Sequence, residues 1–236
     1  MYWLRTVFNT LVYGTGAIVW LMISAVAARP WIKTGAQVRK LVYWQSRGIL
    51  FFMRLCAKSW RVEPAPRPQG PAVVAANHAS SLDLYCVAAL GFNNVMYITK
   101  GWVFRLPFFR FVMKRAGYID AETTPPDEML ARCRRAAEAG CDIVVFPQGS
   151  RRNPQGRFKS GAFYLAEKLN MPVIPVAIGG TGQMLAPGSV WLHPSDIVLK
   201  SLPPIRPDEF SGPLVHLEMA RRTKSVIMQF LQGETL

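Results

Sequence analysis

Acidic side chains are scarce in this sequence. Its 236 residues include 14 Asp and Glu against 28 Lys and Arg, which gives a net charge of +14. An excess of this size attracts anionic partners such as lipid headgroups, phosphorylated substrates or nucleic acids. No RNA- or DNA-recognition signature accompanies the basic residues, so we expect no nucleic-acid partner. Half of the residues are hydrophobic, which favours contact with a membrane.

Cysteine and histidine are few and widely separated. The cysteines form no C-x-x-C pair and no disulfide-type spacing, which suits a reducing compartment. They are Cys56, Cys86, Cys133 and Cys141. Only three histidines accompany them, so the sequence predicts no metal site. A G-x-S-x-G elbow is also lacking, and we therefore expect no covalent acyl-enzyme intermediate.

Charge is absent from residues 6–28, a run that lies between Arg5 and Arg29. A helix of this length can cross a bilayer, because each residue adds about 1.5 Å. A cleaved signal peptide is the second interpretation, since Ala25-Val26-Ala27 resembles a cleavage site. Whether the run spans the membrane or enters it as a hairpin with the next segment stays open.

Residues 31–60 mix aromatic, aliphatic and basic side chains. Two interpretations fit equally well: a helix lying in the membrane interface, or a second helix packed on the following domain. Pro64, Pro66 and Pro68 then indicate a linker over residues 61–70. We therefore expect membrane-associated helices in residues 1–60 and a globular domain in residues 61–236.

The globular part alternates strand-like and helix-like segments. Apolar runs at residues 71–76, 95–98, 142–146 and 173–178 predict strands, and Pro175 suggests that the last of these is an edge strand or contains a bulge. Residues 191–202 are expected to supply further edge strands. Helices are expected at residues 107–116, 125–140, 160–169 and 214–232. This alternation predicts an α/β fold with a mixed, mostly parallel sheet flanked by helices.

His78 follows the first of these predicted strands, and Asp83 lies five residues later. Ser80 and Asp83 have the spacing of a capping box that opens a helix. In such a turn Asp83 can accept a hydrogen bond from one imidazole nitrogen and leave the other free to take a proton. The alternative is a helix cap beside a structural histidine.

A second polar turn, residues 147–152, follows the clearest predicted strand, residues 142–146. Ligands bind at the carboxyl ends of strands in open α/β sheets. Gly149 would let the backbone approach a ligand, and Arg151 can grip a phosphate or carboxylate through two hydrogen bonds. The alternative is a basic surface turn.

Four blocks in this order resemble the glycerolipid acyltransferase family, which includes the bacterial 1-acyl-glycerol-3-phosphate acyltransferases. They lie between about residues 73 and 178: Asn77-His78 to Asp83, Gly117-Tyr118-Ile119-Asp120, Phe146-Pro147-Gln148-Gly149-Ser150-Arg151, and Val173-Ile174-Pro175-Val176. The resemblance implies that His78 is a general base oriented by Asp83. It implies substrate-binding roles for Asn77, Lys100, Gln148, Gly149, Ser150, Arg151 and Lys159.

The implied reaction needs no cofactor, because an acyl thioester is already activated. Acyl-CoA or acyl carrier protein would donate the acyl group to the sn-2 hydroxyl of 1-acyl-glycerol-3-phosphate and give phosphatidic acid. The site would lie on the cytoplasmic face of a bacterial inner membrane. Two departures concern the acceptor. Gln148 stands where the family usually has Glu, and Ala121 where it usually has Arg. Lyso-ornithine lipid or a lysophospholipid is therefore an alternative acceptor, and a hydrolase or a non-catalytic lipid-binding module are further alternatives.

Overall fold

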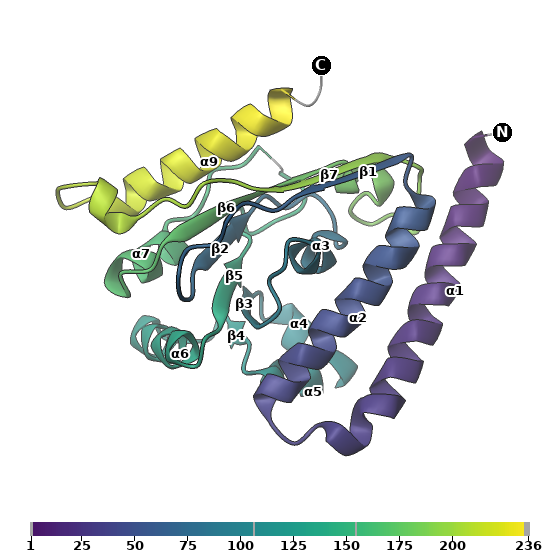
Figure 1. Cartoon of the computed structure of the whole chain (residues 1–236), viewed down its shortest axis with the longest axis horizontal. Helices are drawn as coiled ribbons and strands as arrows, with labels where there is room; N and C mark the ends of the chain where they lie inside the picture. Colours follow the sequence, from purple (N-terminus) through teal and green to yellow (C-terminus); the bar gives the residue numbers. More distant parts are fainter. Residues whose placement is uncertain (1, 106, 154, 234–236) are drawn as a thin grey trace.

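The computed structural model describes residues 2–105, 107–153 and 155–233 (Figure 1). A seven-stranded sheet forms its centre, in the order β1-β7-β6-β2-β5-β3-β4. The strands are β1 (Ser59–Glu63), β2 (Val73–Ala76), β3 (Val95–Thr99), β4 (Ile119–Asp120), β5 (Asp142–Val145), β6 (Val173–Gly179) and β7 (Asp196–Ser201). The five strands from β6 to β4 are parallel to one another, whereas β7 is antiparallel to β6 and parallel to β1. The predicted mixed, mostly parallel sheet is therefore confirmed.

Helices cover both faces of the sheet. Figure 1 shows α6, α7 and α9 on one face, and α3 with α2 behind it on the other. The helices are α1 (Tyr2–Ala28), α2 (Gly35–Cys56), α3 (Asp83–Ala89), α4 (Trp102–Arg105), α5 (Pro107–Ala116), α6 (Pro126–Glu138), α7 (Gly161–Lys168), α8 (Thr181–Met184) and α9 (Val215–Gly233), with 3-10 turns η1 (Arg29–Trp31) and η2 (Pro207–Glu209). The helices expected at residues 107–116, 125–140, 160–169 and 214–232 are all present.

The central strands are apolar on both faces because helices lie on both sides. Every residue of β2 and of β5 is buried, as expected for parallel strands between two helical layers. Ile143, Val144 and Val173 are completely inaccessible to solvent. Burial of each such side chain contributes about 1.5–3 kcal/mol to the stability of the fold. The loop with His78 therefore follows a strand that is firmly packed in the core.

The amino-terminal helices α1 and α2 form an antiparallel pair (Figure 1). Small residues allow close approach: the Cα of Gly16 faces Phe52, and that of Gly48 faces Trp20. Phe8, Met22 and several other large apolar side chains of α1 remain exposed. The stretch Tyr2–Trp31 is long and apolar enough to cross a membrane by length and composition.

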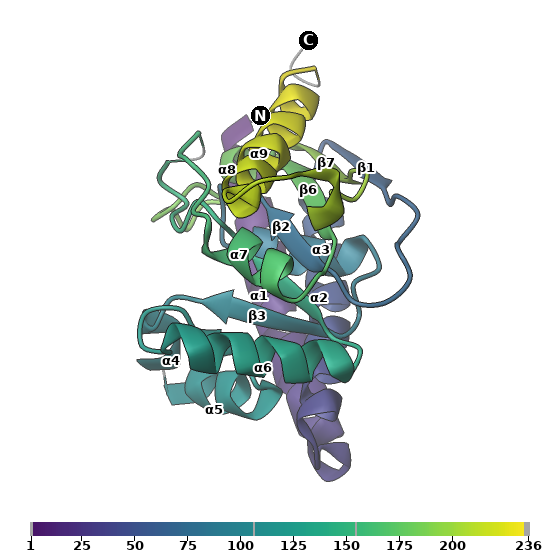
Figure 2. The ribbon, with the colours of Figure 1, turned by 90° about the vertical axis from the view of Figure 1, so that its left-hand side faces the viewer.

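Polar residues near the start of α1 attach it to the rest of the protein. Asn9 donates to the carbonyl of Cys56 at 3.0 Å. The Thr10 hydroxyl accepts from the Leu192 amide at 2.9 Å, and Thr6 Oγ1 lies 3.2 Å from His193 Nδ1. Both termini lie at this end of the molecule (Figures 1 and 2).

The second helix packs on the globular part, as one of the two interpretations of residues 31–60 predicts. Its position at a membrane interface stays a prediction. Thr34 begins α2 through a capping box with Gln37. Ile49, Met53 and Cys56 are buried, and α2 lies against α3 and α5. α2 therefore lies between α1 and one face of the α/β layer.

Three local predictions were wrong. The expected linker over residues 61–70 begins inside β1, which pairs with β7. Residues 191–202 form only β7, which lies one strand in from the edge. The strand with Pro175, β6, is not an edge strand, since it lies between β2 and β7. Its missing N–H falls opposite Leu202, just past the end of β7, and the Pro175 carbonyl still accepts from the Leu202 amide at 2.9 Å.

The division into residues 1–60 and 61–236 stays a prediction, although β1 extends across that boundary.

Candidate active site

The site is built where β2 and β5 end side by side. These neighbouring parallel strands pair up to Ala75 and Val145. The chain leaves β2 through α3 towards β3, and leaves β5 through α7 towards β6, on the opposite face of the sheet (Figure 1). Two connections that diverge in this way open a crevice at the carboxyl ends of the strands. The loops with His78 and Gln148 both lie there.

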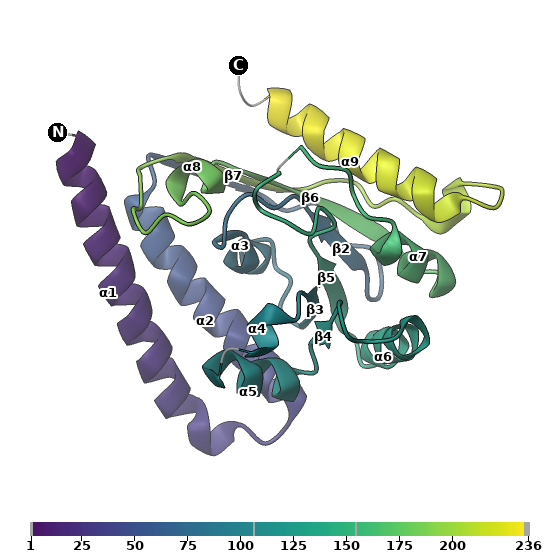
Figure 3. The same ribbon diagram turned by 180° about the vertical axis from the view of Figure 1, so that it is seen from behind.

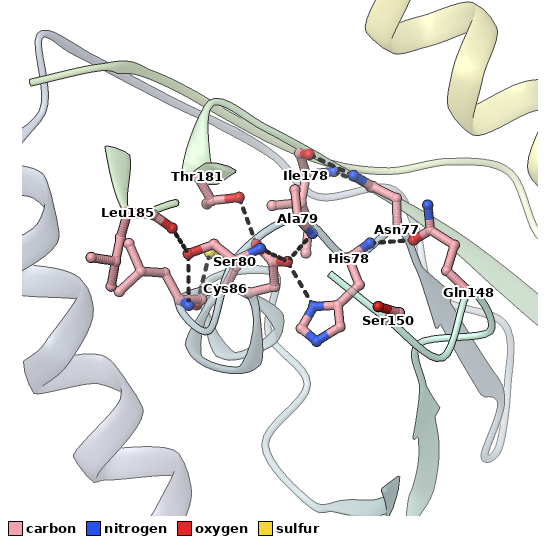
Figure 4. Close-up of polar contacts among 12 residues, drawn as sticks. Asn77, His78, Ala79, Ser80, Cys86, Gln148, Ser150, Ile178, Thr181 and Leu185 are labelled. Atoms are coloured by element: carbon pink, nitrogen blue, oxygen red, sulfur yellow. Dashed lines mark hydrogen bonds and ion pairs between the residues drawn. The ribbon is translucent and has the colours of Figure 1, made fainter. Parts of the chain in front are cut away.

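His78 and Asp83 form a hydrogen-bonded pair. The distance from His78 Nδ1 to Asp83 Oδ2 is 2.8 Å. The Asp83 side chain is completely buried, whereas 16% of the His78 side chain is exposed. The other ring nitrogen points away from Asp83 (Figure 4). An ionised carboxylate can only accept hydrogen bonds, so the pairing assigns the proton to Nδ1 and leaves Nε2 as the basic nitrogen.

Asp83 is held by three further donors. Its Oδ2 accepts from the amides of Ala79 and Ser80 at 2.7 and 2.9 Å, and its Oδ1 accepts from the Thr181 hydroxyl at 2.6 Å. Backbone amides and a buried hydroxyl thus fix the carboxylate before any substrate arrives. Supporting contacts of this kind keep a catalytic pair in its productive orientation.

Only half of the predicted capping box between Ser80 and Asp83 forms. The Asp83 carboxylate accepts from the Ser80 amide, but the Asp83 amide donates to the Ser80 carbonyl and not to its hydroxyl. The residue before α3 is Leu82, which has no side-chain cap. The Ser80 hydroxyl instead donates to the carbonyl of Leu185 at 2.7 Å and accepts from the Leu82 amide at 3.3 Å. The same Asp83 oxygen also faces His78 Nδ1 and the Ala79 amide, so the half-formed box is part of the His78 loop.

Sequence analysis missed Thr181. It lies in α8, directly after β6, in the sequence Gly179-Gly180-Thr181-Gly182. Gly180 has a φ of +84°, and a Cβ there would lie 1.8 Å from the Asp196 carbonyl oxygen. Only glycine fits this turn, which aims Thr181 at Asp83. A glycine-rich stretch at the carboxyl end of a strand was the available signal.

Gln148 and Phe146 position His78 from the neighbouring strand. Gln148 Oε1 accepts from the His78 amide at 2.5 Å. The Phe146 ring stacks on the imidazole with ring centroids 4.3 Å apart. Gln148 is buried, and its carbonyl oxygen holds the backbone of the His78 loop. Contact between Gln148 and a substrate stays a prediction.

Asn77 ties the His78 loop to β6. Its Nδ2 donates to the Ile178 carbonyl and its Oδ1 accepts from the Ile178 amide, both at 2.8 Å (Figure 4). Both polar atoms of the Asn77 side chain are thus bonded to the Ile178 backbone. Contact between Asn77 and a substrate stays a prediction.

The other predicted binding residues follow β5. Gly149 has a φ of +67°, and a Cβ there would lie 3.2 Å from the Lys159 side chain. Lys159 is placed by its amide, which donates to the Pro147 carbonyl at 2.9 Å. Ser150 is exposed, and its hydroxyl accepts from the Arg152 amide at 3.2 Å. Arg151 lines a cleft of about 1080 Å³. The cleft reaches Asn77 and Ala79, the residues directly before and after His78 in the sequence.

Lys100 also follows the carboxyl end of a parallel strand, but it lies further from His78. It follows β3, which is two strands away from β2. Ala121, where the resemblance leads one to expect arginine, follows β4, one strand further. In the described part of the chain, no hydrogen bond or ion pair joins Lys100 to the His78 loop.

The nearest thiol is unsuited to nucleophilic chemistry. Cys86 is completely buried and donates to the Leu82 carbonyl at 3.4 Å. Burial raises the pKa of this thiol well above its ordinary value, and the nearby Asp83 carboxylate adds to the rise. Among residues 2–105, 107–153 and 155–233, no three His, Cys, Asp or Glu side chains are grouped to hold a metal ion.

Comparison with known proteins identifies the family. A model described as acyltransferase matches residues 60–179, about half of the chain, from β1 to the end of β6. The chain belongs to the acyltransferase family. The match contains both loops of the candidate site, so the pair of His78 and Asp83 lies within this acyltransferase's family domain.

Curated relatives share lower identity over longer regions. The chloroplastic 1-acyl-sn-glycerol-3-phosphate acyltransferase of Brassica napus is 29% identical over 197 residues, which cover 79% of this acyltransferase and 56% of the relative. The 1-acyl-sn-glycerol-3-phosphate acyltransferase of Helicobacter pylori is 24% identical and covers 65% of the chain and 67% of the relative. The chain thus spans just over half the length of the plant protein.

A solved structure shares the whole fold. The 1-acyl-sn-glycerophosphate acyltransferase PlsC of Thermotoga maritima superposes with a TM-score of 0.77 and covers 100% of this chain and 98% of its own. Sequence identity is 20%. The agreement includes the amino-terminal helices as well as the α/β layer.

Proposed function

We propose that this acyltransferase transfers a fatty acyl group from acyl-CoA or acyl-ACP to the sn-2 hydroxyl of 1-acyl-glycerol-3-phosphate and produces phosphatidic acid. The observation that carries the proposal is the pair of His78 and Asp83 at 2.8 Å, beside a cleft lined by Arg151. The names of the relatives, which are 1-acyl-sn-glycerol-3-phosphate acyltransferases, support the choice of acceptor.

His78 acts as the general base. Its Nε2 takes the proton of the acceptor hydroxyl while that oxygen attacks the thioester carbonyl. The imidazolium that forms is stabilised by the buried Asp83 carboxylate 2.8 Å away. The carbon–sulfur bond then breaks, and the imidazolium returns the proton to the leaving thiolate. No cofactor or metal is needed, because the thioester is already activated.

The acceptor's polar head lies against the turn that follows β5. Arg151 supplies a cation there, and Gly149 allows the backbone to approach. Lys100, Ser150 and Lys159 are further candidates at the same sheet edge. The departures at Gln148 and Ala121 favour a second candidate acceptor, lyso-ornithine lipid or another lysophospholipid, since both change groups expected near the acceptor head.

The exposed apolar face of α1 supports attachment to a membrane. We infer that the sheet edge with His78 faces the cytoplasm at a bacterial inner membrane, where acyl-CoA and acyl-ACP are available. Membrane lipids would then surround α1 and supply the lysolipid.

The test is acyl transfer by the purified protein in detergent, from a long-chain acyl thioester to 1-acyl-glycerol-3-phosphate. General-base catalysis contributes about 10²–10⁴-fold, so His78→Ala should lose at least that factor. His216→Ala is the matched control, because His216 Nδ1 lies 2.9 Å from Glu167 and the side chain of His216 is 22% exposed against 16% for His78. His216 does not line the cleft.

Each outcome decides a different part of the proposal. Product from the intact protein and from His216→Ala, but not from His78→Ala, supports both the reaction and the base. Activity retained by His78→Ala would refute the base. Free fatty acid without acylated acceptor would indicate a hydrolase, and product only with lyso-ornithine lipid or another lysophospholipid would change the acceptor.

A further inference from the structure

Among the residues that the structure describes, cations line the cleft next to Asn77 and Ala79, and no acidic side chain does. Its described lining includes Arg151, Arg152 and Lys224 but no Asp or Glu. The two arginines follow β5, whereas Lys224 comes from α9. Three positive charges without a compensating carboxylate give the cleft a strong preference for an anion.

The two guanidinium groups are available to a ligand. Among the residues that the structure describes, neither Arg151 nor Arg152 has a hydrogen bond or ion pair from its guanidinium. A guanidinium that is free of a carboxylate can bind phosphate through two parallel hydrogen bonds.

Lys224 joins the two sides of the cleft. Its Nζ donates to the carbonyl of Gln155 at 2.9 Å, which holds α9 against the loop that carries the arginines. An ammonium group has three donors, so two remain for a ligand. α8 also contributes to the cleft, through Gly182 and Gln183. Seen from behind, α8 lies between α1 and the end of α9 (Figure 3).

The remaining wall of the cleft mixes apolar side chains, amide side chains (Asn77, Gln155, Gln183 and Gln232) and glycine backbone. Ile178 and Met228 line it, together with the glycine-rich turn that begins at Gly179. A ligand that carries phosphate beside a hydrocarbon or amide chain matches such a wall. Both proposed substrates are of this kind.

We propose that Lys224 of α9 binds a phosphate group of a substrate, together with Arg151 and Arg152. This inference rests on the proposed function and adds to it a ligand from outside residues 60–179, the region that the family model matches. The phosphate belongs either to the lysolipid acceptor or to the carrier of the acyl group, and kinetics can distinguish these sources.

The test compares Lys224→Gln, Lys224→Arg and Arg221→Ala. Glutamine can still donate to the Gln155 carbonyl but lacks the charge, whereas arginine keeps both. Arg221 is an exposed cation of the same helix that does not line the cleft. One lost charge-assisted hydrogen bond predicts that Lys224→Gln raises one substrate KM by about tenfold or more, with little change in kcat. Lys224→Arg and Arg221→Ala should stay close to the unaltered protein.

The substrate whose KM rises identifies the phosphate. A rise for 1-acyl-glycerol-3-phosphate alone assigns the cleft to the acceptor. A rise for acyl-CoA that disappears with acyl-pantetheine, a thioester without phosphate, assigns it to the carrier. Lys224→Gln with unchanged KM for both substrates would overturn the inference, since the lysine would then serve only to hold Gln155.

A binding measurement separates this inference from the proposed function. CoA and short-chain 1-acyl-glycerol-3-phosphate are titrated by calorimetry into the full-length protein in detergent and into Lys224→Gln. Weaker binding of either probe by the variant supports the cleft even where no acyl transfer is detected, in which case only the proposed reaction fails. Equal binding by both proteins, or binding of neither probe by the unaltered protein, refutes the cleft.

Discussion

Asp83→Asn tests how the buried carboxylate acts on His78. Asp83 Oδ2 faces three N–H donors, those of His78 Nδ1, Ala79 and Ser80, whereas Oδ1 faces only the Thr181 hydroxyl. An asparagine must therefore place its oxygen at the three-donor position and its amino group towards Thr181. A hydroxyl can accept as well as donate, so the amide fits and Nδ1 of His78 keeps its proton.

Only the charge is lost in this variant, and the expected cost is modest. Hydrogen bonds to charged groups contribute about 1.5–3 kcal/mol and neutral ones about 0.5–1.5 kcal/mol. A difference of about 1–1.5 kcal/mol in stabilising the imidazolium lowers kcat by about 5- to 13-fold. Where an amide instead forces the imidazole into the other tautomer, the loss reaches about 10⁴-fold.

The assay is kcat for acyl transfer at saturating substrates, with thermal unfolding measured in parallel. Thr181→Val is the companion change. In the double variant, the amino group of the introduced asparagine would lose its acceptor, and an unsatisfied buried donor costs about 1–3 kcal/mol of stability. A loss of kcat in Asp83→Asn as large as in His78→Ala would refute this account of the tautomer.

Three further outcomes are expected. Cys86→Ala should keep its kcat within about twofold, because the raised pKa and burial of the thiol exclude it from the chemistry; inactivation of a folded Cys86→Ala protein would contradict this. Gln148→Ala should lower kcat by about tenfold, because the backbone amide of His78 loses its acceptor. Gln148→Glu is the control that keeps an acceptor. Equal losses in both variants would point to a role for the side-chain nitrogen of Gln148. Ile18→Lys with Met22→Lys on the exposed face of α1 should weaken co-sedimentation with lipid vesicles while kcat in detergent persists; unchanged sedimentation would show that another surface attaches the protein.

The alternation of apolar runs and turns was enough to predict most helices and the strands β2, β3, β5 and β6. Strands such as β5 are clear in the sequence because every residue is buried between two helical layers. The pairing of β1 with β7 was not predictable, because it joins segments more than a hundred residues apart and neither has a distinctive pattern. The prediction from Pro175 failed for a similar reason, since its neighbour Leu202 is known only from the fold.

At the site, the five-residue spacing of His78 and Asp83 predicted their contact, which the structure confirms at 2.8 Å. The same loop also suggested a capping box, of which only the bond from the Ser80 amide to the Asp83 carboxylate forms, because local patterns cannot show that the Leu185 carbonyl takes the Ser80 hydroxyl. Lys224 could not be singled out either. A single lysine on an amphipathic helix looks like a solvated residue until the fold places it across from Arg151.

Polar contacts connect α1 to the loop that carries His78 and Asp83. The Thr10 hydroxyl holds the Leu192 amide, the His193 amide donates to the Met184 carbonyl, and the Leu185 carbonyl receives the Ser80 hydroxyl beside Asp83. A helix resting in lipid would therefore fix the height of the imidazole above the acyl chains. A lysolipid would then need to move out of the bilayer only until its glycerol hydroxyl reaches His78. Its acyl chain would stay among the acyl chains of the surrounding lipids.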